Sequence, residues 1–448
     1  LALAHVIVFD ELYDKDFVEQ WTSGFEGLKE HLRPYTPTWA EGVTWVPAED
    51  TVAAARRYAL ERPSALEWGV AIEQTPNSLQ NVRAISLLRG LTGNLDVPGA
   101  DILGMNITKP YPVLKQALPQ GMIGKRIGGQ EFKLLGGFHA FMPSAHIPGL
   151  FDAMLTGEPY PVRGLLLFGN NPLVTVANPR KVREAMLGLD LLVATDLFLT
   201  PSAALADWVL PGAMWPEIEQ IIELPFVAEN AVFANRKLLQ VGQCRQCEEI
   251  MIDLARRLDL PGADATLRDL LDEQLSPLGL TYAELLERFV VHPPHEYRKF
   301  EKRGFRTLSR KVELYSKALE RMGYAPYPSY VEPPESPVST PELAAEFPYV
   351  LITGARRREF FCSEHRQVPT LRRRRPDPLV ELHPAVAERH GIADGDWIDV
   401  ISPRGRARFK ARVTEDIAAG VVSVDHGWWF PEQAGPAFGV FDSNANLL

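Results

Sequence analysis

The strongest constraint on the fold is an alternation of apolar runs and helix signals in the middle of the chain. Leu165–Phe168 is a continuous apolar run, typical of a strand that is buried on both faces. A Gly-Asn-Asn-Pro turn ends it, and Asn178-Pro179 then has the pattern of a helix start, with a capping Asn and a Pro in the first turn. Two more short strands are expected at 189–195 and 208–211. The order strand, helix, strand, helix, strand predicts a parallel α/β sheet.

A proline-rich segment marks the clearest domain boundary. It holds Pro326, Pro328, Pro333, Pro334, Pro337 and Pro341. The first 160 residues have mostly helical spacing, whereas the last hundred or so alternate with a period of two, as in a small β-barrel. We therefore expect a helical and α/β part at 1–160, a parallel α/β domain at 161–325, a linker at 326–347 and a β-barrel at 348–448.

Composition excludes several classes of function. A net charge of -10 argues against a protein that binds nucleic acid or a membrane surface non-specifically, because such proteins are normally basic. Three cysteines are too few for a disulfide framework. No apolar run reaches the roughly 18 residues that a membrane span needs. The chain opens on the apolar run Leu1–Phe9, without Met, and stops straight after an Asn-rich loop. We expect it to be a piece of a longer chain, which leaves the compartment open.

Polar residues follow two neighbouring strands of the predicted sheet. Gly169, Asn170, Asn171 and Pro172 form the turn after the first strand, and Asp196 ends the second, 27 positions after Gly169. Ligands of open α/β sheets bind at the carboxyl ends of strands, where amides and a carboxylate can meet phosphates, a ribose or a guanine. Each feature alone is equally consistent with a plain turn or a local cap. Together they favour a nucleotide-binding half-domain without the GxGxxG motif of nicotinamide or flavin enzymes.

Three other motifs are more ambiguous. Thr353-Gly354 is followed by three arginines, which suits close approach to a phosphate. The later run Arg372–Arg375 is, taken alone, more often a solvated surface. Cys244-x-x-Cys247 lacks the additional ligands that a zinc or iron–sulfur site needs, because Cys362 lies in another predicted domain. We expect the cysteine pair to be structural.

Five blocks, in this order and spacing, resemble the molybdopterin oxidoreductases of the dimethyl sulfoxide reductase family. The Asn-Asn turn and the Ser-Glu-His-Arg-Gln run are closest to the branch that contains acetylene hydratase and thiosulfate or polysulfide reductase-like proteins. The resemblance covers nearly the whole chain. The blocks are Trp68–Asn77 with Leu91–Asn94, Phe168–Pro172, Asp196–Thr200 with Ala206–Pro211, Phe361–Gln367, and Ile392–Asp396 through Trp428-Trp429 to Asn444–Leu447.

The resemblance implies a bis-molybdopterin guanine dinucleotide cofactor that holds one Mo or W atom. It makes 1–160 the remainder of an inserted cofactor-binding domain, 161–325 a Rossmann-like guanine-dinucleotide domain and 348–448 a double-psi-type barrel. Trp428 and Asn444 would close the second site, although the tryptophans are equally suited to fill a domain interface. The first dinucleotide would be lined by Gly169, Asn170, Asn171, Pro172, Asp196, Thr200 and Asp207. Gly354, Arg356, Ser363, His365, Arg366 and Gln367 would meet the pterins and phosphates from the barrel side.

The resemblance also implies parts that this chain does not contain. Family members carry a 4Fe-4S cluster on four cysteines near the N-terminus and then a Ser, Cys, selenocysteine or Asp ligand to the metal. We expect both before Leu1, so the catalytic residues stay unknown and no metal ligand is assigned here. Cys362 stands where many relatives have His, which leaves the role of that position open.

The expected function is that of a large catalytic subunit, in fragment. It would transfer oxygen, sulfur or hydrogen equivalents, with electrons passing through an iron–sulfur cluster. The alternatives are a hydratase or hydroxyl transferase on the same cofactor, and a non-catalytic dinucleotide-binding module. Expected partners are a small-molecule substrate, an iron–sulfur electron-transfer subunit and a membrane anchor subunit, with no nucleic acid.

Overall fold

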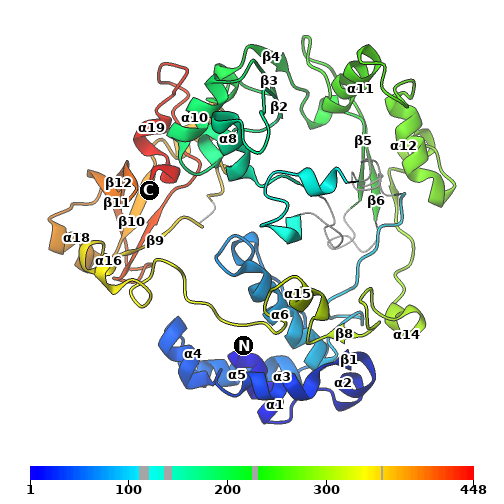
Figure 1. The fold of residues 1–448 in the computed structure, drawn as a ribbon, viewed down its shortest axis with the longest axis vertical. Helices are drawn as coiled ribbons and strands as arrows, with labels where there is room; N and C mark the ends of the chain where they lie inside the picture. The colour runs from blue at the N-terminus through cyan, green and yellow to red at the C-terminus, as the bar shows by residue number, and fades with distance from the viewer. Residues whose placement is uncertain (110–120, 136–143, 224–230, 355–356) are drawn as a thin grey trace. The chain divides into compact units, whose positions relative to one another are not determined.

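The computed structural model describes residues 1–109, 121–135, 144–223, 231–354 and 357–448 (Figure 1). The chain divides into two compact units that interleave along the sequence. Unit 1 comprises Leu1–Ile107, Glu223–Phe233 and Val290–Pro334, and unit 2 comprises the rest. Each unit thus gathers segments that are far apart in the chain. The domain boundaries expected from the sequence stay predictions.

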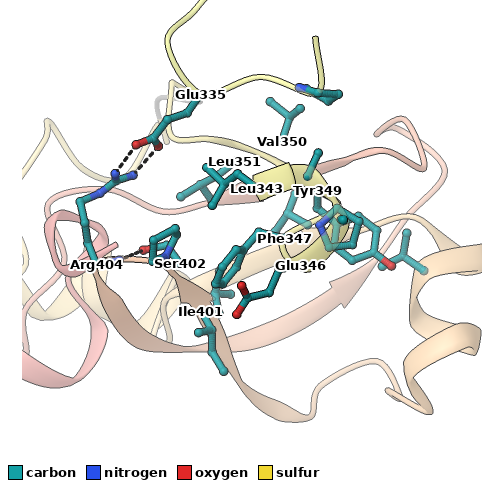
Figure 2. A pocket seen from close by; sticks show the side chains of 18 of the residues that line it. Glu335, Leu343, Glu346, Phe347, Tyr349, Val350, Leu351, Ile401, Ser402 and Arg404 are labelled. Atoms are coloured by element: carbon teal, nitrogen blue, oxygen red, sulfur yellow. Dashed lines mark hydrogen bonds and ion pairs between the residues drawn. The ribbon is translucent and has the colours of Figure 1, made fainter. Parts of the chain in front are cut away.

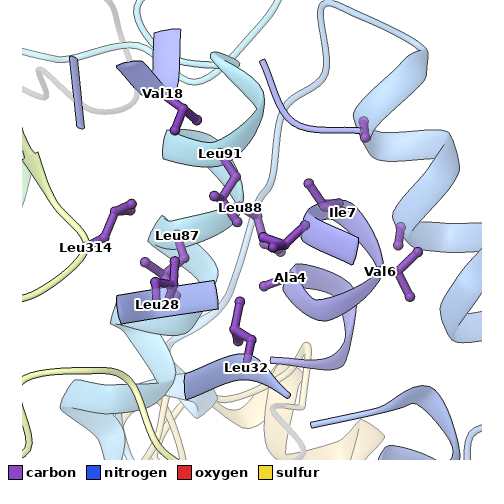
Figure 3. Packing of buried hydrophobic residues seen from close by; sticks show 13 residues of the cluster. Ala4, Val6, Ile7, Val18, Leu28, Leu32, Leu87, Leu88, Leu91 and Leu314 are labelled. Carbon is purple, nitrogen blue, oxygen red and sulfur yellow. The ribbon is translucent and has the colours of Figure 1, made fainter. Parts of the chain in front are cut away.

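Unit 1 is mainly helical. Its first helix, α1 (Ala2–Phe9), is apolar nearly all round and is largely buried, as expected for a short apolar run in a core. Figure 3 shows side chains of α1 and α6 gathered in one cluster, to which Leu314 from late in the chain also belongs. The other elements are α2 (Lys15–Trp21), α3 (Phe25–Leu32), α4 (Pro37–Thr44), α5 (Ala48–Leu60), η1 (Val70–Ile72), α6 (Ser78–Thr92), α14 (Lys299–Arg303), α15 (Lys317–Arg321), and the paired strands β1 (Thr22–Ser23) with β8 (Val312–Glu313) and β6 (Val232–Asn235, whose last two residues belong to unit 2) with β7 (Val290–Val291).

Unit 2 contains the parallel sheet that the sequence predicts. Strands β2 (Gly164–Phe168), β3 (Leu191–Asp196) and β4 (Trp208–Pro211) lie side by side in that order, all parallel. Helix α10 (Pro179–Leu187) begins at Asn178, whose side chain accepts a hydrogen bond from the backbone N–H of Lys181. The remaining elements here are α8 (Ile147–Thr156), α9 (Pro172–Thr175) and η4 (Ala203–Leu205).

One face of this sheet differs from the expectation. Leu167 is buried together with Phe151 of α8 and Met186 of α10, so these helices cover its face. Leu166 and Trp208 are 41% and 66% exposed. The continuous apolar run predicted burial on both faces, but in the structure the residues of the second face remain partly open to solvent.

The end of the chain forms a five-stranded sheet that mixes parallel and antiparallel pairs. The strand order is β11-β12-β10-β13-β9. Pairs β9–β13 and β10–β12 are parallel, and β10–β13 and β11–β12 are antiparallel. The strands are β9 (Val350–Ile352), β10 (Leu379–Leu382), β11 (Trp397–Ser402), β12 (Gly405–Val413) and β13 (Val421–Val424), with helices α16 (Pro341–Glu346), α17 (Pro369–Arg374), α18 (Pro384–His390), α19 (Val440–Ser443) and η7 (Ala445–Leu447).

The predicted fold class is confirmed as α/β, with a parallel sheet followed by a curled C-terminal sheet. Within the described ranges, no helix is long and apolar enough to cross a bilayer. The rest of unit 2 consists of η2 (Ile123–Lys125), η3 (Lys133–Leu135), η5 (Trp215–Glu217), β5 (Gln220–Glu223, whose last residue belongs to unit 1), α11 (Cys247–Arg257), α12 (Leu267–Leu275), η6 (Ser276–Leu278) and α13 (Tyr282–Arg288).

Candidate functional site

The carboxyl edge of β2 and β3 brings the Asn turn and Asp196 together. The N–H of Gly169 donates to the carbonyl of Thr195, 2.8 Å away, so the turn starts beside the end of β3. Gly169 has φ +55, and a Cβ built there would meet no atom within 4 Å. The turn is therefore open on this side, and it uses a left-handed backbone that favours glycine.

Asn171 holds a fixed position in this turn while one of its donors stays free. Its Oδ1 accepts from both the N–H and the hydroxyl of Ser202, at 3.2 and 2.7 Å. Its Nδ2 is buried and has no hydrogen-bond partner among the described residues. Asn170 beside it is exposed, and Pro172 opens α9. A buried amide N–H without an acceptor is costly, so this atom suits a ligand that accepts a hydrogen bond.

Asp196 is half-buried and belongs to a local network. Its carboxylate accepts from the N–H of Leu197 at 2.7 Å and from the hydroxyl of Thr200 at 3.3 Å. Burial raises the pKa of this carboxyl above its ordinary value, although these hydrogen bonds oppose the shift. A carboxylate has about four acceptor positions, so room remains beside the bonds from Leu197, Phe198 and Thr200 for a donor of a guanine.

Asp207 does not join this edge. It precedes β4 and sits opposite Leu192, whose N–H donates to its carboxylate at 2.7 Å. Asp196 pairs with Pro211 at the other end of the same strands. Four residues of strand correspond to about 13 Å, so Asp207 lies at the amino end of the sheet. Its place in the dinucleotide site stays a prediction.

Arg366 lies in the interior of the C-terminal part. It is 2% exposed, between the rings of Phe360 and Trp428, with its guanidinium carbon 4.4 and 4.2 Å from the ring centres. Its N–H groups donate to the carbonyls of Gly427 at 2.8 Å, of Cys362 at 2.9 Å and of His426 at 3.0 Å. Burial lowers the pKa of Arg366 to about 9. A direct contact with a phosphate stays a prediction, because only Nη1 lacks a partner among the described residues, and it is buried.

Asp425 is a key residue that sequence reasoning missed. It is 2% exposed and binds two arginines, Arg357 through Nε at 2.6 Å and Arg375 through Nη2 at 3.0 Å. It also accepts from the N–H of Leu379 at 2.9 Å. The arginine run at 372–375 was expected to be surface, yet only its middle two residues are exposed. The sequence signal that could have pointed to Asp425 is its position directly after β13.

The tryptophan pair is fully buried. The Nε1 of Trp429 donates to the carbonyl of Ser363 at 2.8 Å, and its ring belongs to the core of the parallel sheet. Trp428 packs on Phe360 and Arg372. These contacts fit the alternative in which the tryptophans fill a domain interface. A ring with no exposed area offers no free face on which a pterin could stack. A direct cofactor contact for Trp428 stays a prediction.

The other residues expected on the barrel side differ in accessibility. Gly354 and His365 are exposed, Ser363 is buried, and Gln367 is half-buried with an unpartnered Oε1. Arg356 lies outside the described residues. Asn444 is fully buried and donates to the carbonyl of Val174 at 3.1 Å, three residues past Asn171. This bond places Asn444 beside α9, the helix that follows the Asn turn.

Two further features lie apart from these residues. Cys244 donates its thiol hydrogen to Glu217 at 2.8 Å, and this bond, with burial, raises the pKa of the thiol. Nowhere in the described chain do three His, Cys, Asp or Glu side chains come together as a metal site. Figure 2 shows a cavity of about 780 Å³ lined by apolar side chains of α16, β9 and β11, with Arg404 paired to Glu335 at 2.6 Å. None of the predicted site residues lines it.

Comparison with known proteins agrees with the sequence resemblance. A family model described as "Molybdopterin oxidoreductase" matches residues 1–224, and one described as "Molydopterin dinucleotide binding domain" matches residues 349–448. The chain is 33% identical to an acetylene hydratase of Syntrophotalea acetylenica, over 97% of this chain and 63% of the relative. It is 28% identical to a dopamine dehydroxylase of Eggerthella lenta, over 95% and 50%.

A solved structure of similar fold agrees with the family models and with the sequence relatives. The structure of acetylene hydratase from Pelobacter acetylenicus matches with a TM-score of 0.92 at 30% identity, covering 100% of this chain and 66% of that one. The chain thus spans less than two thirds of the length of the relatives named here. The matching models, the identity and the shared fold together show that the chain belongs to the molybdopterin oxidoreductases of the dimethyl sulfoxide reductase family.

Proposed function

We propose that this chain is the dinucleotide-binding portion of the catalytic subunit of a molybdenum or tungsten enzyme. It would hold a bis-molybdopterin guanine dinucleotide cofactor. The observation that carries the proposal is the buried Nδ2 of Asn171, which has no partner among the described residues and sits in an open turn at the carboxyl edge of a parallel sheet. The family model of a dinucleotide-binding domain over residues 349–448 supports it independently.

The residues at this edge fit the chemistry of a guanine dinucleotide. Gly169 lets a pyrophosphate approach the backbone, and Asn170 and Asn171 supply amide donors. Asp196 has an acceptor position left for a donor of a guanine, N1 or N2, and Thr200 holds its carboxylate in place. Pro172 begins α9 and fixes the end of the turn.

The C-terminal part would contribute the second set of contacts. We assign Gly354, Ser363, His365 and Gln367, together with Arg356, to the pterins and phosphates. Arg366 would act mainly by supporting the turn that carries Ser363 and His365. Its hydrogen bonds to the carbonyls of Cys362 and Gly427 shape this turn. When bound, the cofactor supplies the metal-centred chemistry. The chain's own residues bind it, orient it and balance the charge of its phosphates.

For the complete protein we propose a redox enzyme that transfers oxygen, sulfur or hydrogen equivalents. Electrons would pass through a 4Fe-4S cluster to an iron–sulfur subunit, with a membrane anchor subunit as a further partner. A second candidate is a non-redox hydratase or hydroxyl transferase, which is favoured by the likeness to acetylene hydratase. An assay with and without an added electron acceptor separates the two, since only the redox enzyme needs one.

Cofactor content tests the binding proposal. Asn171→Ala removes the free amide donor, and Arg366→Ala removes the support of the neighbouring turn. The purified variants should contain less molybdenum or tungsten, and acid should release less guanine nucleotide from them. These losses should appear before any change in substrate affinity. Asn81→Ala, in α6 of unit 1, is the matched control and should keep its cofactor. Normal metal and nucleotide content in both site variants would overturn the proposal.

A further inference from the structure

The starting observation is a buried positive charge without a counter-charge. Arg366 is 2% exposed, and its hydrogen bonds go to three neutral carbonyl groups. It forms no ion pair with any carboxylate of the described residues. Charges buried in proteins are normally paired, because an isolated ion loses its hydration without compensation. We therefore expect a negatively charged partner for the guanidinium of Arg366.

The neighbouring charges do not provide that partner. Arg357 and Arg375 share Asp425, and Arg357 also reaches Glu381 at 3.1 Å. Arg372, which also packs on the ring of Trp428, pairs with Glu432. Four guanidinium groups, those of residues 357, 366, 375 and 412, thus face two carboxylates, those of residues 381 and 425. Positive charge is left over, and Arg366 is the one of these four arginines that has no ion pair among the described residues.

A small cavity lies at this charge. Arg357, Arg366, Asp425 and Trp428 are among the residues that line it, and its volume is about 10 Å³. That is space for about one water-sized sphere. The buried atoms without a hydrogen-bond partner include Nη2 of Arg357, Nη1 of Arg366 and Nε1 of Trp428. All three are donors that belong to residues lining the cavity, which suits a species that accepts hydrogen bonds.

We propose that this cavity binds one monoatomic anion, a chloride ion, as the counter-charge of Arg366. A phosphate group does not fit a space of this size, whereas a halide is a single atom, only somewhat wider than a water molecule, and accepts several N–H donors at once. Asp425 does not repel it strongly, because two arginines already neutralise that carboxylate. The ion would hold the segment 360–366 against the segment 425–428. The inference does not depend on the proposed function.

Bromide substitution in crystals tests the site directly. The protein, purified with its cofactor, would be crystallised from sodium bromide and measured at the bromine absorption edge. We expect one anomalous peak within hydrogen-bonding distance of Nη1 of Arg366 and Nε1 of Trp428. An ordered water, or no density, would overturn the proposal. A cofactor phosphate on Nη1 would also overturn it, while leaving the proposed function standing.

Anion-dependent stability tests the same site in solution. Replacing gluconate with about 200 mM chloride at constant ionic strength should raise the Tm of the wild-type protein by about 2–4 °C. Trp428→Phe keeps the ring and removes one donor, so its shift should be smaller. Arg366→Met should lose the shift, and Arg373→Met, an exposed arginine of α17, should keep it. An equal chloride response in all four proteins would show that the ion does not bind at Arg366.

Discussion

Asn444 donates a hydrogen bond from Nδ2 to the carbonyl of Val174, 3.1 Å away and 270 positions earlier in the chain. Asn446 donates to the same carbonyl at 2.8 Å, and the N–H of Asn178 returns a bond to the carbonyl of Asn446. The end of the chain is thus held against α9, the helix that follows the Asn turn. The geometry of the candidate site depends on this contact, because α9 begins one residue after Asn171.

Asn444→Ala tests this contact. Val174 keeps its bond from Asn446, but the partly buried N–H of Asn446 loses its acceptor on Asn444. We expect a loss of about 1–2 kcal/mol in the free energy of unfolding, measured with urea. The control Asn81→Ala should change it by less than about 0.5 kcal/mol. Equal values for the two variants would mean that the bond does not stabilise the fold.

Asp425→Asn should be the most destabilising of the single changes discussed here. It removes a buried carboxylate and leaves Arg357 and Arg375 without their shared counter-charge. Breaking a buried ion pair from one side costs about 3–5 kcal/mol. The matched control is Asp399→Asn, whose partner Arg408 is exposed, and it should cost less than about 1 kcal/mol. Thermal unfolding measures the Tm of both variants. A similar Tm would show that the buried ion pairs of Asp425 stabilise the fold no more than the exposed pair of Asp399 does.

Gly169→Ala separates backbone strain from ligand contact. The new Cβ meets no atom within 4 Å, so only the left-handed backbone, at a cost of about 1 kcal/mol, disfavours it in the free protein. Gly157 has φ +77 and equally open space, so Gly157→Ala carries the same strain away from the strand edge. We expect similar Tm values, with cofactor content lowered only in Gly169→Ala. Equal cofactor content would argue against close approach of a ligand at this turn.

The stability of the protein should depend on pH through Asp196. An unfolded Asp titrates near about 3.9, and burial raises the pKa of Asp196 in the folded protein. A raised folded pKa favours folding when both states are protonated. This contribution is lost as pH rises from the unfolded pKa through the folded pKa.

Asp196→Asn, which stays neutral, should therefore be more stable than the wild-type protein above this range. The difference should vanish below about pH 4. Urea unfolding of the cofactor-free protein between about pH 3 and 8 measures it. A stability difference that does not vary with pH would exclude Asp196 as its origin.

The Cys244–Cys247 pair should behave as two ordinary thiols, one buried and one half-buried. Burial raises the pKa of Cys247, and the hydrogen bond to Glu217 raises that of Cys244, so neither is an activated thiolate. A thiol reagent should modify Cys247, which is half-buried, before Cys244. Cys244→Ala should cost about 1–2 kcal/mol and leave the metal content unchanged. Loss of zinc or iron in this variant would revive the metal-site interpretation.

Local sequence patterns predicted the scaffold of the site well. Apolar runs and Asn-Pro starts are short-range signals, and they predicted the parallel strands, helix α10 and the Asn turn at the strand ends. They failed where burial depends on the surroundings. Leu166 belongs to a continuous apolar run, yet its exposure follows from which face α8 and α10 cover.

The order of its apolar runs, its turn residues and its family blocks determined, from the sequence alone, an α/β chain of the molybdopterin oxidoreductase family. Only the tertiary structure decided the state of the charged side chains. Arg366 meets the carbonyl of Gly427 across 61 positions, and Asp425 meets Arg357 across 68. Periodicity and local motifs do not indicate which residues meet across so many positions of the chain. Whether an arginine is a solvated surface charge or a buried cation is therefore set by the packing of segments that the sequence keeps far apart.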